Sequence, residues 1–286
     1  MLLLLAIELI CSTSLHGMQK QPKQEFPLQN ITFTIPAIAN KVYKQVTKTD
    51  LLNIKPESQL GPIGIITALI VRPEKDKRTI LPSLQLMPQG YIYGDKQQEK
   101  KDDPDRQYGA VSLMRSDVSH ALGGSFIPGD NIHVEGLHIG KDHLADGDLI
   151  IISDPETLNI KSILLKTYVA HYACWKLLAR CGQDAFNFLN AEGEYENGNN
   201  KEKEEFVHGL HHRLRGIMLV ILKGGEIALN DLVTIAHGTE KDTLLAQLNL
   251  TSAAAQWLEK SVKPAEEYEN QEKAKRELRN KTRVKK

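Results

Sequence analysis

The cysteine at position 174 is the residue around which covalent chemistry is most simply organised. Strand-like residues precede it and a helical apolar pattern follows it, so Cys174 is expected where a strand becomes the first turn of a helix. The N–H groups and the dipole of a helix N-terminus favour an anion there, including a thiolate. His171 and Lys176 could add positive charge nearby. The alternative interpretation is that Cys174 is a small buried hydrophobic residue.

A second cysteine, Cys181, follows further along the same stretch. On one helix the two cysteines would lie about 10 Å apart along the axis, whereas a disulfide needs Cα atoms within about 7 Å. Alternatively, Cys181 and Gly182 mark the end of a short first helix, with a break at the glycine. In either case we interpret Cys181 as a packing residue.

The overall composition is that of an ordinary globular protein. The 286 residues are 41% hydrophobic and 25% charged, and 36 basic residues balance 36 acidic ones. No net positive field and no basic-aromatic module favours nucleic acid as a partner. Three cysteines are too few for a disulfide framework, which favours a reducing compartment.

The first residues are apolar and complicate the question of compartment. They resemble the core of a signal peptide, but they include Glu8 and lack a positive n-region. The run is too short to span a bilayer as a helix, so no firm membrane segment is expected. We expect residues 1–17 to be a signal-like or helical N-terminus of a cytoplasmic or organellar protein, with secretion as the alternative.

The remaining chain divides into a polar arm, a β-rich domain and a charged tail. The polar arm covers residues 18–63, the domain residues 64–237, and the charged helical tail residues 238–286. Several β-branched or apolar runs in the domain predict strands. The segments with clear signals are strands at 65–71, 80–87, 108–114 and 217–222, a short helix at 116–122 ended by Gly123-Gly124, and a helix at 240–259.

Two segments of the domain share one pattern. Residues 144–152 and 227–235 both read apolar, Ala, any residue, Gly or Asn, Asp, Leu, β-branched, any residue, Ile. Gly and Asn tolerate positive φ, so each segment predicts a tight turn that leads into a strand. The matched pair predicts a barrel with internal pseudo-symmetry. Asp148 and Asp231 look catalytic, but as acceptors for backbone N–H groups in the turns they need no further role.

Three arginines are candidates for binding an anion. Arg213 and Arg215 alternate with Leu214 just before the strand expected at 217–222. If the strand includes them, one faces inward as an anion clamp and the other faces outward. Arg106 ends a charged segment, most simply a solvated loop, and could instead point into a site.

The order of these motifs resembles that of the MOSC domain, named for the C-terminal domain of molybdenum cofactor sulfurases. The resemblance covers roughly residues 64–236 and rests on a co-linear series rather than on one motif. The series is Gly90-Tyr-Ile-Tyr-Gly94-Asp95, Val111-Ser-Leu113, Asn131-Ile-x-Val134-Glu135-Gly136-Leu137, Gly147-Asp148, Ala173-Cys174-x-x-Leu177, Arg215-Gly216-x-x-x-Val220 and Asn230-Asp231.

The resemblance implies a mostly-β, barrel-like fold with a few helices and a pocket for a molybdopterin-type cofactor or a related anionic heterocycle. The family's motif cysteine, proposed to carry sulfur or to meet molybdenum, falls on Cys174. Its downstream arginine falls on Arg215, or on Arg213 if the register slips. Lys176, Arg106 and Asn131 complete the expected cofactor-binding set.

The sequence also departs from the family pattern. Members often have a cysteine and a proline where this chain has His171 and Ala173, and the second glycine–aspartate turn is Asn230-Asp231. The larger sulfurases carry a pyridoxal phosphate domain, for which this chain has no room, so the resemblance implies that a partner protein delivers any sulfur. Some simple members of the family reduce N-hydroxylated compounds with electrons from partner proteins, which implies an electron-transfer partner instead. Two hypotheses follow: sulfur transfer or molybdenum-dependent redox chemistry through Cys174, or a non-catalytic barrel that binds a ligand or a protein with a degenerate site.

Overall fold

The computed structural model describes residues 31–34, 46–74, 77–88, 90–96, 98, 111–124, 130–169, 171, 180–190, 213–262, 265–266 and 270. Three expected site residues, Cys174, Lys176 and Arg106, lie outside the described residues, as does the N-terminal segment 1–17. No helix in the described ranges is both long enough and apolar enough to cross a membrane.

The domain is a closed β-barrel, which confirms the mostly-β fold predicted from the sequence. The ring runs β2-β12-β8-β9-β10-β6-β7, and β7 pairs back onto β2. Neighbouring strands in the ring are antiparallel except β6 and β7, which are parallel. The ring strands are β2 (Ile63–Val71), β6 (Val111–Arg115), β7 (Ile132–Glu135), β8 (Leu149–Ser153), β9 (Ile160–Lys166), β10 (Ile217–Lys223) and β12 (Leu232–Ala236).

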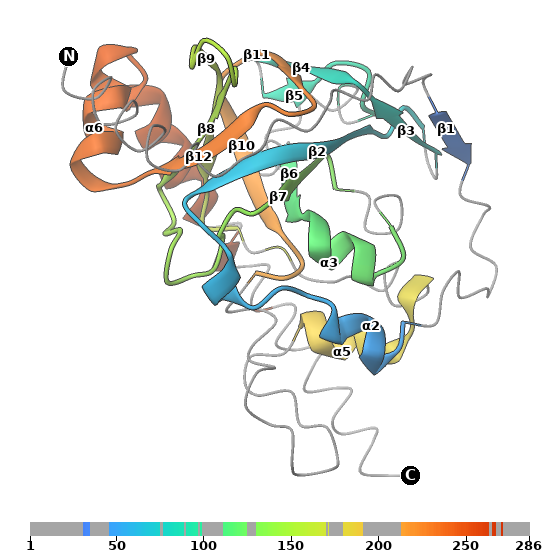
Figure 1. Cartoon of the computed structure of the whole chain (residues 1–286). Coiled ribbons are helices and arrows are strands. Elements are labelled where there is room, and N and C mark those ends of the chain that lie inside the picture. Colours follow the sequence, from blue (N-terminus) through green and yellow to red (C-terminus); the bar gives the residue numbers. More distant parts are fainter. Residues whose placement is uncertain are drawn as a thin grey trace.

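Smaller elements surround this ring (Figure 1). Strands β3 (Lys77–Leu81) and β1 (Ile31–Thr34) extend the sheet beyond β2, while β11 (Gly225–Ala228), β4 (Ser83–Met87) and β5 (Tyr91–Ile92) form a separate small sheet. The helices are α2 (Lys48–Leu52), the 3₁₀ turn η2 (Glu57–Gln59), α3 (Ser116–Ala121), α5 (Gln183–Leu189) and α6 (Gly238–Gln247). Helices α2, α3 and α5 gather at one end of the barrel around a shared apolar cluster.

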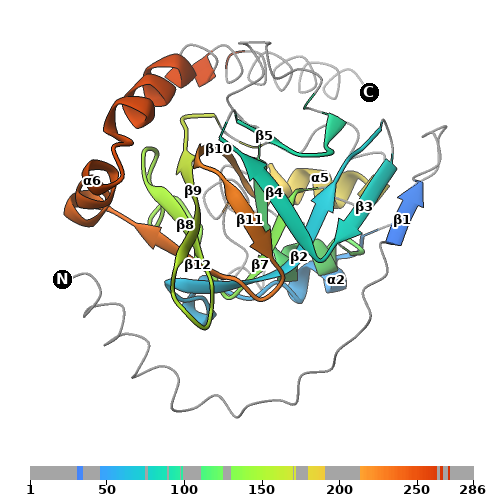
Figure 2. The same ribbon diagram turned by 90° about the horizontal axis from the view of Figure 1, so that it is seen from above.

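Strands β8 and β9 are buried on both faces. Ile150 and Leu164 belong to the barrel core, whereas their neighbours Leu149 and Leu165 pack in a second cluster beneath α6 and the helical residues 251–262. Figure 2 shows α6 lying outside β8 and β12. Double-sided burial explains why these strands read as continuous apolar runs rather than as alternating ones.

Two expected elements are interrupted in the structure. The strand expected at 80–87 is divided at Pro82 into β3 and β4, which belong to different sheets, because proline has no N–H to donate to a ladder. The helix expected at 240–259 ends as α6 and resumes at residue 251, because Asn249 has a φ of 56°. Its predicted apolar side is confirmed by the packing of Leu244 and Leu245 against the barrel.

The two matched segments form equivalent turns, which confirms the predicted internal repeat. The Asp148 carboxylate accepts a hydrogen bond from the Ala145 N–H at 2.7 Å, and the Asp231 carboxylate accepts one from the Ala228 N–H at 2.7 Å. The residue before each aspartate has positive φ, 92° at Gly147 and 70° at Asn230. The backbone roles predicted for both aspartates are therefore confirmed.

The repeat extends into the barrel. The N–H of Gly147 donates to the Lys166 carbonyl of β9 at 2.7 Å, and the N–H of Asn230 donates to the Ile66 carbonyl of β2 at 2.9 Å. Strands β8 and β12 pair with each other in antiparallel fashion. The two turns are therefore related by a local two-fold axis between β8 and β12, and each turn joins its strand to a neighbour in the ring.

Because the turns are equivalent, Asp148→Ala and Asp231→Ala are expected to cost similar amounts of stability, about 1–3 kcal/mol each. Each replacement removes a turn acceptor and a side-chain partner, the His237 ring at 2.8 Å from Asp148 and the Lys161 ammonium at 2.6 Å from Asp231. Urea unfolding measures the loss, with the exposed Asp242→Ala as a control expected within about 0.5 kcal/mol of the parent. A loss of stability in only one of the two variants would show that the two turns are not equivalent.

Candidate functional site

A buried ion pair lies where β6 is flanked by β7 and β10. Asp130 directly precedes Asn131 and β7, Arg215 lies just before β10, and both of these strands pair with β6. The Arg215 guanidinium donates to the Asp130 carboxylate at 2.5 Å, and their side chains are only 8% and 0% exposed. Burial raises the pKa of the Asp130 carboxyl, but the Arg215 charge and the neighbouring histidines outweigh it and hold that pKa below its usual value.

Two histidines complete this group, which we call the Asp130 cluster (Asp130, His133, His171 and Arg215). His133 lies on β7 and is fully buried, and burial lowers its pKa to about 4. His171 has its Nδ1 3.5 Å from the Asp130 carboxylate, and burial together with the Arg215 charge lowers its pKa to about 3. Both imidazoles are neutral at pH 7, so His171 does not supply the positive charge expected from the sequence.

Several polar atoms of the Asp130 cluster lack a hydrogen-bond partner. Among the described residues, nothing pairs at hydrogen-bond geometry with Asp130 Oδ1, with either ring nitrogen of His133, with His171 Nδ1 or with Arg215 Nε, although all are buried. Native proteins leave few buried polar atoms in this state, and such groups are enriched where ligands bind or reactions occur. The cluster is therefore our candidate functional site.

Cys174, the expected nucleophile, follows His171 by three residues in the sequence and lies outside the described residues. Cys181, by contrast, is fully buried in the apolar cluster between α2, α3 and α5. Gly182, with a φ of 88°, caps α5, which confirms the interpretation of Cys181 as packing and the break at the glycine.

Asn131 has a side chain that is fully engaged by the protein. Its Oδ1 accepts from the backbone N–H and hydroxyl of Ser112 and from Arg72, each at 3.2 Å. Its Nδ2 donates to the Ile70 carbonyl at 3.0 Å and to Asp95 at 3.3 Å. The residue expected to bind a cofactor therefore joins β2, β6 and the start of β7.

The strand interpretation of Arg213 and Arg215 was wrong. Residues 213–215 form a turn, closed by a 2.7 Å hydrogen bond from the Gly216 N–H to the Arg213 carbonyl, and β10 begins only at Ile217. Arg213 has a φ of 49°, outside the strand region. Alternation therefore does not apply: Arg215 reaches Asp130, and Arg213 donates to the Leu144 carbonyl at 2.5 Å.

Lys166 is a buried cation that the sequence reasoning missed. Its ammonium lies 2.9 Å from the Asp146 carboxylate and its side chain is 3% exposed, and burial lowers its pKa to about 8. It is close enough to His171 for its charge to lower that pKa as well. The available signal was a single lysine closing the apolar run of β9.

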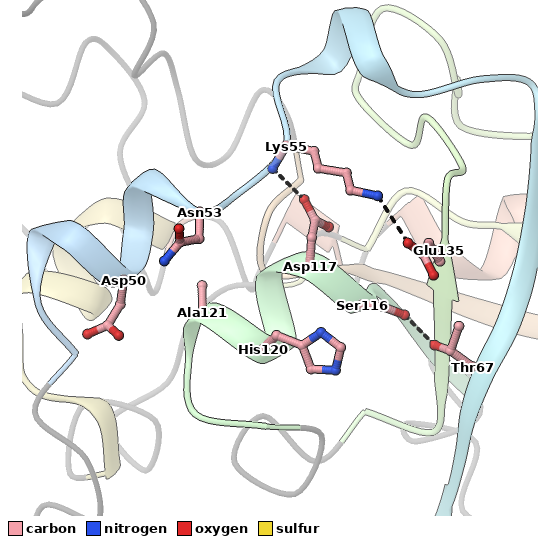
Figure 3. Close-up of a pocket in the computed structure, with 9 residues that line it drawn as sticks. All are labelled: Asp50, Asn53, Lys55, Thr67, Ser116, Asp117, His120, Ala121 and Glu135. Atoms are coloured by element: carbon pink, nitrogen blue, oxygen red, sulfur yellow. Dashed lines mark hydrogen bonds and ion pairs between the residues drawn. The ribbon is translucent and has the colours of Figure 1, made fainter.

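A pocket of about 320 Å³ opens beside α3 (Figure 3). Ser116, on α3, contacts Thr67 of β2, and the ion pair between Lys55 and Glu135 spans 3.0 Å along the lining. Burial is the main cause of the lowered His133 pKa, and His120 is close enough to contribute to it, so the pocket neighbours the Asp130 cluster. The remaining lining residues are Asp50, Asn53, Asp117 and Ala121. Polar and charged side chains supply all of the lining except Ala121, and the sequence reasoning did not identify this pocket.

Comparison with known proteins identifies only remote likeness. No family model matches the chain, and no curated protein matches it. Among solved structures, the YuaD protein from Bacillus subtilis is 16% identical with a TM-score of 0.37, covering 60% of this chain and 95% of that one. YiiM from Escherichia coli is 12% identical with a TM-score of 0.37, covering 61% and 71%. YiiM from Geobacillus stearothermophilus is 12% identical with a TM-score of 0.33, covering 71% and 100%. Likeness at this level says nothing of what this chain does.

Proposed function

We propose that this chain is a MOSC-type barrel that binds a molybdopterin-type cofactor, or a related heterocycle, at the Asp130 cluster and presents Cys174 to it. The observation that carries the proposal is the set of buried polar atoms without partners in that cluster. A heterocycle with ring N–H and carbonyl groups can pair with a carboxylate oxygen, a guanidinium Nε and neutral imidazoles. The co-linear motif order in the sequence supports the choice of family.

The described residues fit the heterocycle better than they fit its phosphate. Arg215 is already paired with Asp130, Arg213 is bound to Leu144 and Asp146, and Asn131 is engaged by its neighbours. Of the cofactor-binding set expected from the sequence, Arg215 fits through its Nε, whereas Arg213 and Asn131 do not fit. The cofactor, when bound, would supply the metal and redox chemistry, and this chain would hold its ring.

Cys174 would act as the sulfur acceptor in this proposal. Its thiolate would attack the outer sulfur of a persulfide on a donor protein, forming a Cys174 persulfide and releasing the donor as a thiolate. Three cations, Arg215, Arg72 and Lys166, act on His171 strongly enough to lower its pKa. The same charges would favour a thiolate at a cysteine tethered three residues from His171.

The alternative is a non-catalytic barrel that binds a ligand or a protein. The engagement of Arg213 and Asn131 by the protein itself favours this reading, because those side chains offer little to an anionic cofactor. Metal and pterin analysis of the purified protein separates the two functions. Bound molybdenum with a pterin, lost on Asp130→Asn but kept on the exposed Glu226→Gln, would support the proposal, and their absence after expression with an intact cofactor pathway would contradict it.

The two cysteines provide a comparison within one molecule. If Cys174 is the reactive group, alkylation followed by peptide mapping should modify it first, near neutral pH, because neighbouring cations stabilise the thiolate. Cys181 is 0% exposed and should react only on unfolding. Equal slow rates at both positions would remove the central residue of the sulfur-transfer mechanism and favour the binding module.

A further inference from the structure

Three ligand-type side chains converge beside the barrel, in residues that the proposed function does not use. His138 Nε2 lies 3.0 Å from a Glu57 oxygen and 3.6 Å from Asp142 Oδ1. One ligand atom from each of the three residues lies within 4.8 Å of the others. Although His138 Nε2 is buried, none of the described groups near it is aligned to form a hydrogen bond with it. Its lone pair or proton is therefore not committed to either carboxylate.

Gly140 leaves the space at which these atoms converge. A Cβ added there would lie 2.5 Å from Glu57 Oε1, 2.6 Å from Asp142 Oδ1 and 3.0 Å from His138 Nε2. The φ of Gly140 is not in the left-handed region, so the backbone itself does not require glycine here. The three ligand atoms, rather than the backbone conformation, exclude a side chain at this position.

The scaffold holds the three side chains in place. Glu57 lies in η2, and Gly61, which follows it, makes two backbone hydrogen bonds with the chain after β7. The Gly61 N–H donates to the Gly136 carbonyl at 2.7 Å, and the Gly61 carbonyl accepts from the His138 N–H at 2.9 Å. The Gly140 carbonyl accepts from the N–H groups of His143 and Leu144, at 3.1 and 2.9 Å, which forms the turn that carries Asp142.

Two further contacts orient this site. The His143 ring stacks on the His138 ring, with centroids 4.7 Å apart and planes within 3°. Arg213 donates to the Leu144 carbonyl at 2.5 Å and so fixes the far end of the turn. Orientation of a ligating imidazole by its neighbours is a general feature of metal sites.

We infer that Glu57, His138 and Asp142 form a binding site for a divalent transition-metal cation. One imidazole and two carboxylates suit Zn²⁺, Co²⁺ or Mn²⁺, whereas Ca²⁺ and Mg²⁺ prefer oxygen ligands throughout. Neighbouring ligand atoms on a tetrahedral zinc ion are about 3.3 Å apart, close to the two distances from His138. The Asp142 side chain is 52% exposed, which gives the cation an entry path and leaves a coordination position for water.

The test is a titration of the reduced, metal-free full-length chain with Zn²⁺ by calorimetry and with Co²⁺ by absorption spectroscopy. The parent protein should bind both cations. Its Co²⁺ complex should show d–d bands, with no sulfur-to-metal charge-transfer band from this site. His138→Ala should weaken that binding event by at least about 100-fold, since loss of an outer-shell partner alone costs 10–100-fold. Gly140→Ala, which keeps all three ligands, should also abolish it because the methyl group fills the convergence point.

The control is Glu226→Gln, which changes an exposed carboxylate on β11 and should bind as the parent does. Circular dichroism checks that each variant is folded. Should His138→Ala not fold, Asp142→Asn keeps the test valid, because its side chain is half-exposed. Unchanged affinity and stoichiometry in His138→Ala or Asp142→Asn would overturn the inference. The inference would also be overturned if alkylation of the cysteines abolished metal binding by the parent protein completely.

Discussion

Asp130→Asn is expected to lower the free energy of unfolding by about 3–5 kcal/mol, the largest loss that we expect from any single replacement described above. The replacement keeps the size of the side chain but leaves the Arg215 guanidinium without its counter-charge. Because Arg215 is only 7% exposed, water cannot compensate for the missing partner. Urea unfolding at pH 7 measures the loss.

The double replacement Asp130→Asn/Arg215→Met distinguishes an unpaired charge from a local packing defect. Removing both charges should recover most of the lost stability, because the uncompensated guanidinium is then absent. Glu135→Gln breaks the ion pair with Lys55, whose side chains are 59% and 42% exposed, and should cost at most about 1 kcal/mol. A double variant no more stable than Asp130→Asn would show that the buried charge is not the cause.

Acidification is expected to destabilise the protein through the two buried histidines. The pKa is about 4 for His133 and about 3 for His171 in the folded protein, against about 6.5 when unfolded. The unfolded chain therefore binds more protons below pH 6.5, so stability falls as the pH drops from about 6.5 toward 4. Asp130, whose pKa is also lowered, adds a loss of the same sign at still lower pH.

The size of this effect can be apportioned between the histidines. Between pH 7 and pH 5, His133 alone should account for about 2 kcal/mol. His171 should account for a smaller loss of stability than His133 does, because 17% of its side chain is exposed. His133→Leu removes one titrating group, and neither of its ring nitrogens has an aligned partner to lose.

Urea unfolding at pH 7, 6 and 5 tests this assignment. The His133→Leu variant should lose about 2 kcal/mol less than the parent over that range, and His133→Leu/His171→Leu should lose less again. Identical pH dependence in the parent and in His133→Leu would show that His133 does not remain neutral in the folded protein.

Local signals in the sequence were sufficient for the turns and most strands. The repeated Gly/Asn-Asp pattern predicts the two equivalent turns because both the positive φ and the aspartate acceptor act within four residues of each other. The runs at β2 and β10 are recognisable because burial on a barrel demands apolar, β-branched residues.

The candidate site was harder to predict, because its contacts are long-range. Asp130 and Arg215 are 85 positions apart in the sequence, and only the fold, in which β7 and β10 both pair with β6, brings their side chains together. Arg213 was misassigned since an arginine with positive φ is rare and has no local sequence signal. The Glu57 and His138 pair likewise depends on a bridge between Gly61 and Leu137 that no periodicity reveals.

The position of β12 in the ring has a consequence for how the chain reaches its native state. Among the strands that the structure describes, β12 is the last in sequence, yet it lies between β2, the first strand of the ring, and β8. During synthesis, β2 and β8 therefore have unpaired edges until residues 232–236 emerge, and such edges invite pairing with other chains. Closing the ring requires contacts between residues more than 160 positions apart, such as Ile65 with Leu232. A topology this rich in non-local pairing folds slowly, so the final strand both completes the barrel and ends its exposure to aggregation.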